Sequence, residues 1–149
     1  MSGVVVAGAG QAALQLAASL REACYDGSVT LVCDEPFAPY QRPPLSKEYL
    51  AGDKSFERIL IRPGAFWEER LVEMLLGRRV DAVDAAAHRV TLADGATIGY
   101  GALVWATGGS PRRLVCSGHH LTGVHTVRTR ADADRMMGEL AGTERAVVI

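Results

Sequence analysis

The chain has few cysteines, and they form no pattern that indicates a disulfide framework. Three are present, Cys24, Cys33 and Cys116, and no two of them are spaced as a CxxC pair. An odd number without such pairing argues against a protein that disulfides stabilise in an oxidising compartment. We therefore expect a protein of the reducing cytoplasm, in which Cys33 is a small buried apolar residue.

Long apolar runs, a large net charge and metal-ligand spacings are also absent. The apolar run at residues 4–7 is too short for a signal peptide or a membrane span. The net charge of −1 gives no electrostatic reason to bind nucleic acid or an anionic membrane. The four histidines lack the spacing of metal ligands, and Ser46 lacks partners for nucleophilic catalysis. The sequence therefore predicts no nucleic-acid partner, no membrane partner and no bound metal.

The first 35 residues, by contrast, carry a pattern typical of a strand–helix–strand unit that binds a dinucleotide. A β-branched run at residues 4–6 predicts a buried strand, and "GAGQAA" at residues 8–13 follows it directly. Apolar residues at helical spacing over 13–20 predict a helix, and "SVTLV" at 28–32 predicts a second strand with Asp34-Glu35 at its end. Together these features match the GxGxxA fingerprint of a Rossmann-type α/β fold.

Each residue of the fingerprint has a physical reason. Gly8 permits a tight turn, Gly10 lets a pyrophosphate approach the backbone, and Ala13 sits where the helix lies close to the strand. The free N–H groups and the positive dipole end of the helix would hold the phosphates. A carboxylate about 20 residues further on would bind the adenosine ribose, and both Asp34 and Glu35 qualify by distance. The motif alone leaves open whether the ligand is NAD or FAD.

The middle of the chain predicts a small antiparallel insert. Pro63 suits the first turn of a helix that ends near Arg70, and residues 72–76 predict another strand. Alternating apolar residues follow on both sides of Asp94-Gly95, which is a strong hairpin signal. We therefore expect an antiparallel β-meander inserted after the βαβ unit.

A second buried strand and a helix are predicted further along. The strand, residues 103–106, ends in Thr107 and Gly108, where a glycine again lets backbone approach a ligand. Arg112 follows closely and is placed to meet phosphate or flavin oxygens. Residues 129–140 predict an amphipathic surface helix, whose inward-facing residues are expected to be Met136, Met137 and Leu140.

The segment "PYQRPPLSKEYL", residues 39–50, is poor in both strand and helix character. Two adjacent prolines give it a fixed shape, and Arg42 and Lys47 place positive charge on either side of them. We call residues 39–50 the elbow. Taken alone, Pro43-Pro44 could simply end a loop, and Lys47 could open a solvated helix.

The order of these motifs resembles the ferredoxin reductases of bacterial oxygenase systems, in the pyridine nucleotide-disulfide oxidoreductase superfamily. The resemblance is carried by "VVVAGAGQAA", "VTLVCDE", "PYQRPPLSKEYL", "VTLADG", "LVWATGGSPR" and "GVHTVRTRADADRM", and it covers nearly the whole chain. Relatives of this kind include putidaredoxin reductase and the reductases of biphenyl and toluene dioxygenases. The combination of "RPPLSK" with an upstream βαβ unit is more specific than any one motif.

The resemblance implies FAD as the cofactor and a role for each matching residue. Gly8, Gly10 and Ala13 would line the FAD pyrophosphate, and Asp34 would bind the adenosine ribose in preference to Glu35. Val80 would contact adenine through its backbone. Arg42, Pro44 and Lys47 would lie on the flavin side, and Thr107, Gly108 and Arg112 would close over the cofactor. Lys47 would lie near the reactive N5 edge and is the candidate catalytic residue.

The resemblance also implies an electron-transfer activity. NAD(P)H would reduce FAD, which would reduce a [2Fe–2S] ferredoxin serving an oxygenase or a cytochrome P450. Disulfide reductases of the superfamily carry a CxxxxC pair after the second strand, and this chain has no cysteine there, so electrons would pass directly to the acceptor. A rubredoxin reductase or another NADH oxidoreductase is an alternative, as is an inactive nucleotide-binding fragment.

Length and the C-terminal residues set the expected domains. The 149 residues, of which 48% are apolar, suffice for one domain with a sizeable core. Residues 1–142 are expected to be the N-terminal part of the FAD-binding domain, and residues 143–149 to begin a truncated NAD-binding domain with a strand. No glycine loop follows, so the nicotinamide site is expected beyond Ile149, and the chain alone should not oxidise NADH.

Overall fold

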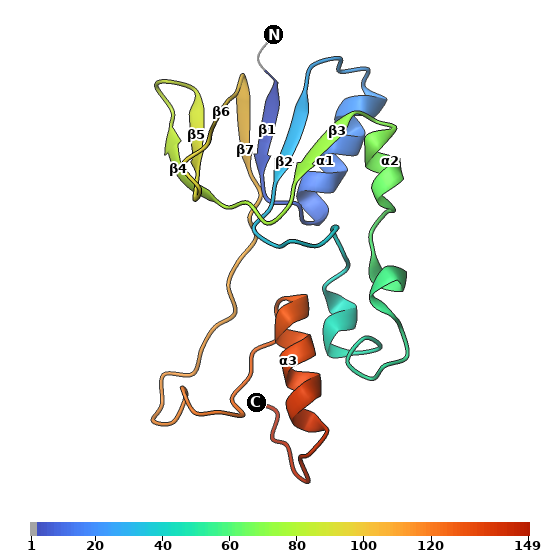
Figure 1. The fold of residues 1–149 in the computed structure, drawn as a ribbon, viewed down its shortest axis with the longest axis vertical. Helices are drawn as coiled ribbons and strands as arrows, with labels where there is room; N and C mark the ends of the chain where they lie inside the picture. Colours follow the sequence, from blue (N-terminus) through green and yellow to red (C-terminus); the bar gives the residue numbers. More distant parts are fainter. Residues whose placement is uncertain (1–2) are drawn as a thin grey trace. The chain divides into compact units, whose positions relative to one another are not determined.

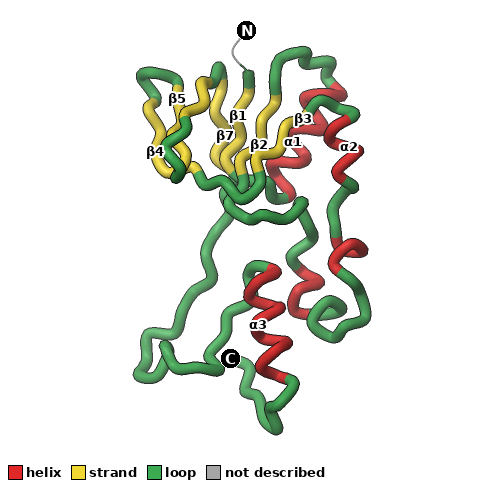
Figure 2. Tube along the Cα trace, viewed as in Figure 1, coloured by secondary structure: helices red, strands yellow, loops and turns green. Residues whose placement is uncertain are grey.

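The computed structural model describes residues 3–149, which form two compact units. We call residues 3–40 and 60–108 the sheet unit, and residues 41–59 and 109–149 the elbow unit. Figure 2 shows that all the strands belong to the sheet unit, whereas the elbow unit contains helices and loops.

The sheet unit is built on four parallel strands in the order β3-β2-β1-β7 (Figure 1). The strands are β1 (Val4–Ala7), β2 (Val29–Val32), β3 (Val72–Leu75) and β7 (Ala102–Trp105). All three pairings are parallel and in continuous register, with β1 bonded to β2 on one side and to β7 on the other. The predicted βαβ unit and the Rossmann-type α/β class are therefore confirmed.

One face of this sheet packs against helices. Helix α1 (Gln11–Glu22) presents Ala13 and Ala17, both fully buried, to Val6 and Leu31 of the sheet. Helix α2 (Gly64–Glu68) adds the buried Trp67 to the same cluster. Small side chains on α1 let the helix lie close to the strands, as the fingerprint requires.

The opposite face of the parallel sheet packs against the small antiparallel sheet. This sheet consists of β4 (Val80–Asp84), β5 (Arg89–Leu92) and β6 (Thr97–Gly99), with a turn at Asp94-Gly95. Its buried residues meet Val5 and Val32 of the parallel sheet. The predicted antiparallel insert and its hairpin are confirmed, and coverage of both faces explains the near-continuous valine runs of β1 and β2.

A single arginine ties three parts of the sheet unit together. The Arg21 guanidinium, on the last turn of α1, donates hydrogen bonds to four carbonyl oxygens at 2.6–2.8 Å. The acceptors belong to Tyr25, Gly27, Arg70 and Leu71. These carbonyls lie before β2 and between α2 and β3, so one side chain fixes the backbone that leads into each of these two strands.

The elbow unit is built from two 3₁₀ turns and one helix. The turns are η1 (Pro43–Ser46) and η2 (Phe56–Ile59), and the helix is α3 (Arg130–Leu140). Thr129 caps α3 by accepting a bond from the Asp132 amide, while the Asp132 carboxylate accepts one from the Thr129 amide. This reciprocal capping box satisfies two amides that a helix start leaves unbonded.

We expect a strand at residues 146–149 to fray without its neighbours, and no strand is present there, where Val147, Val148 and Ile149 are almost fully exposed. Two expectations differ from the structure in detail. Strand β7 is less buried than expected, since it is a sheet edge and Trp105 is 60% exposed. Helix α3 buries Ala133 instead of Leu140, which lies in its last turn and is 39% exposed. Among residues 3–149, no helix is long and apolar enough to cross a membrane.

Candidate functional site

The glycine loop between β1 and α1 lies at the carboxyl end of the parallel sheet. Gly8 has φ of +112°, and a Cβ built there would lie 2.3 Å from the carbonyl oxygen of Ala106. The Gly8 amide donates to the Val32 carbonyl at 2.7 Å, and the Ala106 amide donates to the Ala7 carbonyl at 2.8 Å. Glycine is therefore required here by both the backbone conformation and the close approach of the chain after β7.

Gly10 differs from Gly8, because nothing in the protein requires it. Its φ is −79°, and a Cβ built there would have no heavy atom within 4 Å. Gly10 is the N-cap of α1, and no side chain caps the helix or adds an acidic group to its first turn. The open space and the uncapped amides are what a bound phosphate group needs.

Asp34 stands at the end of β2 on a backbone that is held on both sides. The Cys33 carbonyl accepts a hydrogen bond from the backbone amide of Arg78 at 2.7 Å, and the Glu35 carbonyl accepts one from the amide of Gly77 at 3.0 Å. The Asp34 side chain is exposed and has no hydrogen-bond or ion-pair partner among residues 3–149. Its carboxylate is thus available to a ligand, on a backbone that is hydrogen-bonded on both sides.

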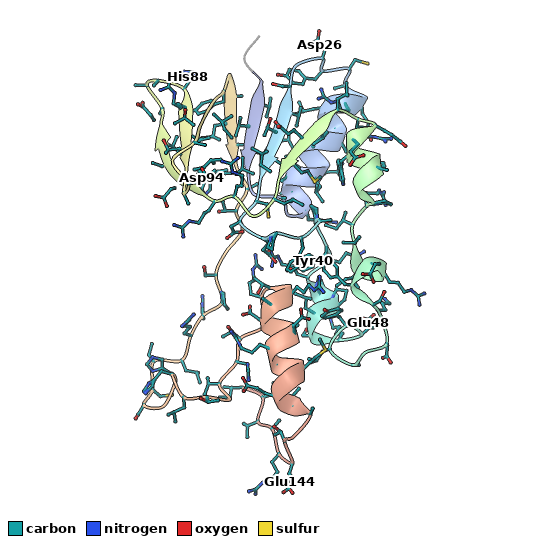
Figure 3. All side chains as sticks on the ribbon, viewed as in Figure 1. Asp26, Tyr40, Glu48, His88, Asp94 and Glu144 are labelled. Atoms are coloured by element: carbon teal, nitrogen blue, oxygen red, sulfur yellow. The ribbon has the colours of Figure 1, made fainter. Side chains whose placement is uncertain are left out.

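The neighbouring acid, Glu35, is engaged within the protein. Its carboxylate accepts a hydrogen bond from the hydroxyl of Tyr40, the residue labelled in Figure 3. Tyr40 is itself buried and bridges to Leu60. Of the two acids that sequence spacing could not separate, Asp34 is therefore the one available to a ribose.

The remaining sheet-unit candidates lie on three different elements. Thr107 and Gly108 come shortly after the last residue of β7, and Gly108 is exposed with φ of +73°. Val80 opens β4 and is half-buried against the apolar cluster of Val5 and its neighbours. Because β1 pairs with β2 on one side and β7 on the other, the loops that follow these strands meet where the strand order reverses, the usual ligand site of such sheets.

The other predicted residues belong to the elbow unit. Pro44 is buried in η1, while Lys47 is exposed at its C-cap and has no hydrogen-bond or ion-pair partner among residues 3–149. Arg42 donates to the carbonyl of Arg128 at 2.6 Å, so it serves the elbow unit itself. Arg112 is exposed in the loop that precedes α3. The structure thus brings the phosphate-loop candidates together in the sheet unit and holds Arg42, Pro44 and Lys47 on one turn of the elbow unit.

Sequence reasoning missed the contacts that hold these candidates in place. Two such contacts are the hydrogen bonds from Tyr40 to Glu35 and from Tyr49 to Asp134. No motif connects the residues of either pair, so sequence spacing gives no signal for these bonds. The capping box of α3 was detectable, because the T-x-x-D pattern at residues 129–132 is a helix-start signal. No group of three or more potential metal-ligating side chains occurs within residues 3–149.

Comparison with known proteins places the whole described chain in one family. The model of the pyridine nucleotide-disulphide oxidoreductases matches residues 2–149. A ferredoxin–NAD(P)+ reductase from Sphingomonas sp is 53% identical over 146 residues, which are 98% of this chain and 35% of the relative. The ferredoxin reductase subunit of a 5,5'-dehydrodivanillate O-demethylase from Sphingobium sp. is 48% identical, over 97% of this chain and 35% of the relative.

Solved structures give the same result for the fold. The ferredoxin reductase of the CYP199A2 system from Rhodopseudomonas palustris superposes with a TM-score of 0.88 at 36% identity, covering 95% of this chain and 35% of that one. Putidaredoxin reductase, in its covalent complex with putidaredoxin, gives a TM-score of 0.84 at 33% identity, with 93% and 34% covered. The chain spans about a third of the length of these relatives. This protein belongs to the pyridine nucleotide-disulphide oxidoreductase family.

Proposed function

We propose that this chain forms the FAD-binding part of an NAD(P)H-dependent ferredoxin reductase. The observation that carries the proposal is the uncapped start of α1 at Gly10, with open space around it, together with an exposed carboxylate, Asp34, that follows the neighbouring strand β2. These features fit the pyrophosphate and the ribose of an adenine dinucleotide. The resemblance to the ferredoxin reductases of oxygenase systems supplies the choice of FAD.

In the sheet unit, each residue has a specific task toward the cofactor. Gly8 keeps the loop close to the end of β7, Gly10 leaves room for the pyrophosphate, and Ala13 lets α1 pack closely enough to direct its amides at the phosphates. The Asp34 carboxylate accepts bonds from the ribose hydroxyls, while Glu35 stays bonded to Tyr40. The residues assigned to adenine and to closure over the cofactor are Val80, Thr107 and Gly108.

In the elbow unit, the residues carried over from the family resemblance would serve the flavin. Pro44 supplies a rigid apolar wall, because its ring leaves little conformational freedom to lose on binding. Lys47 supplies a positive charge that favours the anionic reduced ring, and Arg42 and Arg112 supply further cations. When bound, FAD would take two electrons together from a hydride donor and release them one at a time.

The activity of the whole enzyme follows from the proteins that this chain resembles. A ferredoxin–NAD(P)+ reductase and a ferredoxin reductase subunit of an O-demethylase are 48–53% identical to it. We infer a reductase that accepts electrons from NAD(P)H and passes them to a [2Fe–2S] ferredoxin of an oxygenase or P450 system.

Rubredoxin reduction is the second candidate. A rubredoxin–NAD(+) reductase from Pseudomonas putida is 34% identical over 98% of this chain, and an NADH:rubredoxin oxidoreductase from Clostridium acetobutylicum superposes with a TM-score of 0.82. The higher identity to the ferredoxin reductases favours the first candidate.

The experiment that separates these proposals uses the complete reductase. The purified protein should be yellow, and it should reduce a [2Fe–2S] ferredoxin faster than a rubredoxin when NADH or NADPH is supplied anaerobically. Preferential reduction of rubredoxin would select the second candidate. A colourless protein that gains no flavin absorption with added FAD would contradict the proposed cofactor.

A further inference from the structure

In the turn that carries Lys47, one carbonyl oxygen accepts two backbone hydrogen bonds. The Pro44 carbonyl accepts hydrogen bonds from the amide of Lys47 at 2.9 Å and from the amide of Tyr49 at 3.0 Å. Lys47 and Tyr49 are therefore bonded to the same acceptor and belong to one turn. Glu48 lies between them, is labelled in Figure 3, and forms its close ion pair with Lys54 at 3.2 Å, while the charge of Lys47 also helps to lower the pKa of Glu48.

The Tyr49 side chain fastens this turn to helix α3. Its hydroxyl donates to Oδ1 of Asp134 at 2.5 Å, and its ring meets the edge of Phe56 with centroids 6.4 Å apart. Tyr49 is only 8% exposed. Burial first, and then the bond to the Asp134 carboxylate, raise the pKa of Tyr49, so the phenol stays protonated and remains the donor.

Arg130 of helix α3 contacts both partners of Tyr49, Asp134 and Phe56. Nε of Arg130 lies 3.2 Å from Oδ2 of Asp134, and the Arg130 guanidinium lies over the Phe56 ring at 4.0 Å from its centroid. The other end of the elbow is attached as well, because Arg42 donates to the Arg128 carbonyl just before α3 begins. Lys47 therefore lies between two attachments that join the elbow to α3 and the residues before it.

We propose that Tyr49 and Asp134 are positioning residues that hold Lys47 where it can act on the flavin. The proposal rests on the role of Lys47 in the proposed function. The Tyr49–Asp134 bond fixes the turn through the Pro44 carbonyl, and the turn in turn fixes the backbone of Lys47. Loss of this bond leaves the charge of Lys47 intact but lets its position vary.

If the contact were purely structural, its removal would change only stability, so the test must measure the reduction rate and the midpoint potential of the flavin. A partly buried hydrogen bond from a hydroxyl to a carboxylate that is 41% exposed shifts an equilibrium by roughly fivefold to tenfold. In the complete reductase, Tyr49→Phe should therefore slow flavin reduction by NADH by roughly that factor and make the flavin midpoint potential more negative, while FAD stays bound. Asp134→Ala should act like Tyr49→Phe, and Asp134→Asn, which keeps an acceptor oxygen, should restore most of the wild-type behaviour.

Coupling to Lys47 is the decisive measurement. If Tyr49 acts through Lys47, Tyr49→Phe should change the potential in the wild type but not in a Lys47→Gln background. Tyr100→Phe is the matched control, because Tyr100 is also 8% exposed and its hydroxyl has no partner among residues 3–149. This control should leave the potential and the reduction rate unchanged.

The outcomes separate this inference from the proposed function. An unchanged potential and rate in Tyr49→Phe with FAD bound would overturn the inference and leave the function standing. The same shift with and without Lys47→Gln would also overturn it, because the effect would then bypass Lys47. A wild-type reductase that binds no FAD would overturn both, whereas a shift seen only when Lys47 is present supports the inference.

Discussion

Two glycines of the same loop should respond in opposite ways to the same added methyl group. At Gly8, alanine would hold a φ of +112° that L residues rarely adopt, at a cost of about 1–3 kcal/mol. Its Cβ would also lie 2.3 Å from the Ala106 carbonyl oxygen, which cannot withdraw without straining the bond from the Ala106 amide to Ala7. Gly8→Ala should therefore lower the free energy of unfolding by about 3–5 kcal/mol, a large part of a typical domain's stability.

At Gly10, the methyl group would meet no protein atom within 4 Å, and the φ of −79° suits alanine. Loss of glycine at the N-cap costs at most about 1 kcal/mol. If the FAD pyrophosphate lies over this residue, however, the methyl group crowds it by about 1–3 kcal/mol, which raises the Kd for FAD roughly fivefold to 150-fold.

Urea unfolding of the apo-protein and fluorescence titration with FAD measure the two effects separately. We expect Gly8→Ala to be much less stable, and Gly10→Ala to be nearly as stable as the wild type but weaker in FAD binding. A Gly10→Ala variant that binds FAD as tightly as the wild type would refute the assignment of the pyrophosphate to this loop.

Three further predictions concern charged side chains. Lys47→Gln should leave FAD bound but make the flavin potential more negative and slow reduction by NADH; an unchanged potential in spectroelectrochemistry would remove its tuning role. Arg21→Lys should lower the free energy of unfolding, measured by urea titration, by about 2–3 kcal/mol, because lysine cannot donate to four carbonyl oxygens. Arg62→Lys is the control: Arg62 makes a 3.4 Å hydrogen bond to the carbonyl of the preceding residue, so this change should alter the free energy by less than about 0.5 kcal/mol. Partial burial opposes ionisation of Asp132, but the amide and hydroxyl of Thr129 and the amide of Arg128 outweigh it and lower the pKa below its ordinary 3.8. That contribution to stability is present above pH 3.8 and is lost as the pH falls through the folded-state pKa, so Asp132→Asn should reduce the loss of α3 on acidification, measured by far-UV circular dichroism.

The core of the fold was predictable because local signals agreed there. The valine run of β1, the glycines after it and the small residues of α1 each favour the same βαβ unit, and the structure confirms it. The turn at Asp94-Gly95 likewise identified the antiparallel insert, since that dipeptide suits a tight hairpin.

The parts that local patterns could not predict depend on contacts between distant residues. An apolar pattern at residues 146–149 favours a strand, but a strand also needs a neighbour to bond to, and the pattern cannot supply one. The spacing after the fingerprint allowed Asp34 and Glu35 equally; the family resemblance favoured Asp34, and the bond from Tyr40 to Glu35 in the structure supports that preference. The attachment of Tyr49 to Asp134 spans 85 positions of the chain, so no local motif could indicate it.

The most direct test of the central claim is the choice of dinucleotide at the first glycine loop. In the complete reductase, the Kd for FAD and the KM for NADH should be measured for the wild type, Asp34→Ala and Glu35→Ala. A charge-assisted bond of roughly 1.5–3 kcal/mol predicts that Asp34→Ala weakens FAD binding about tenfold or more, that Glu35→Ala weakens it much less, and that neither changes the KM for NADH. A rise in the KM for NADH with unchanged FAD binding in Asp34→Ala would contradict the account, because this loop would then hold the nicotinamide dinucleotide.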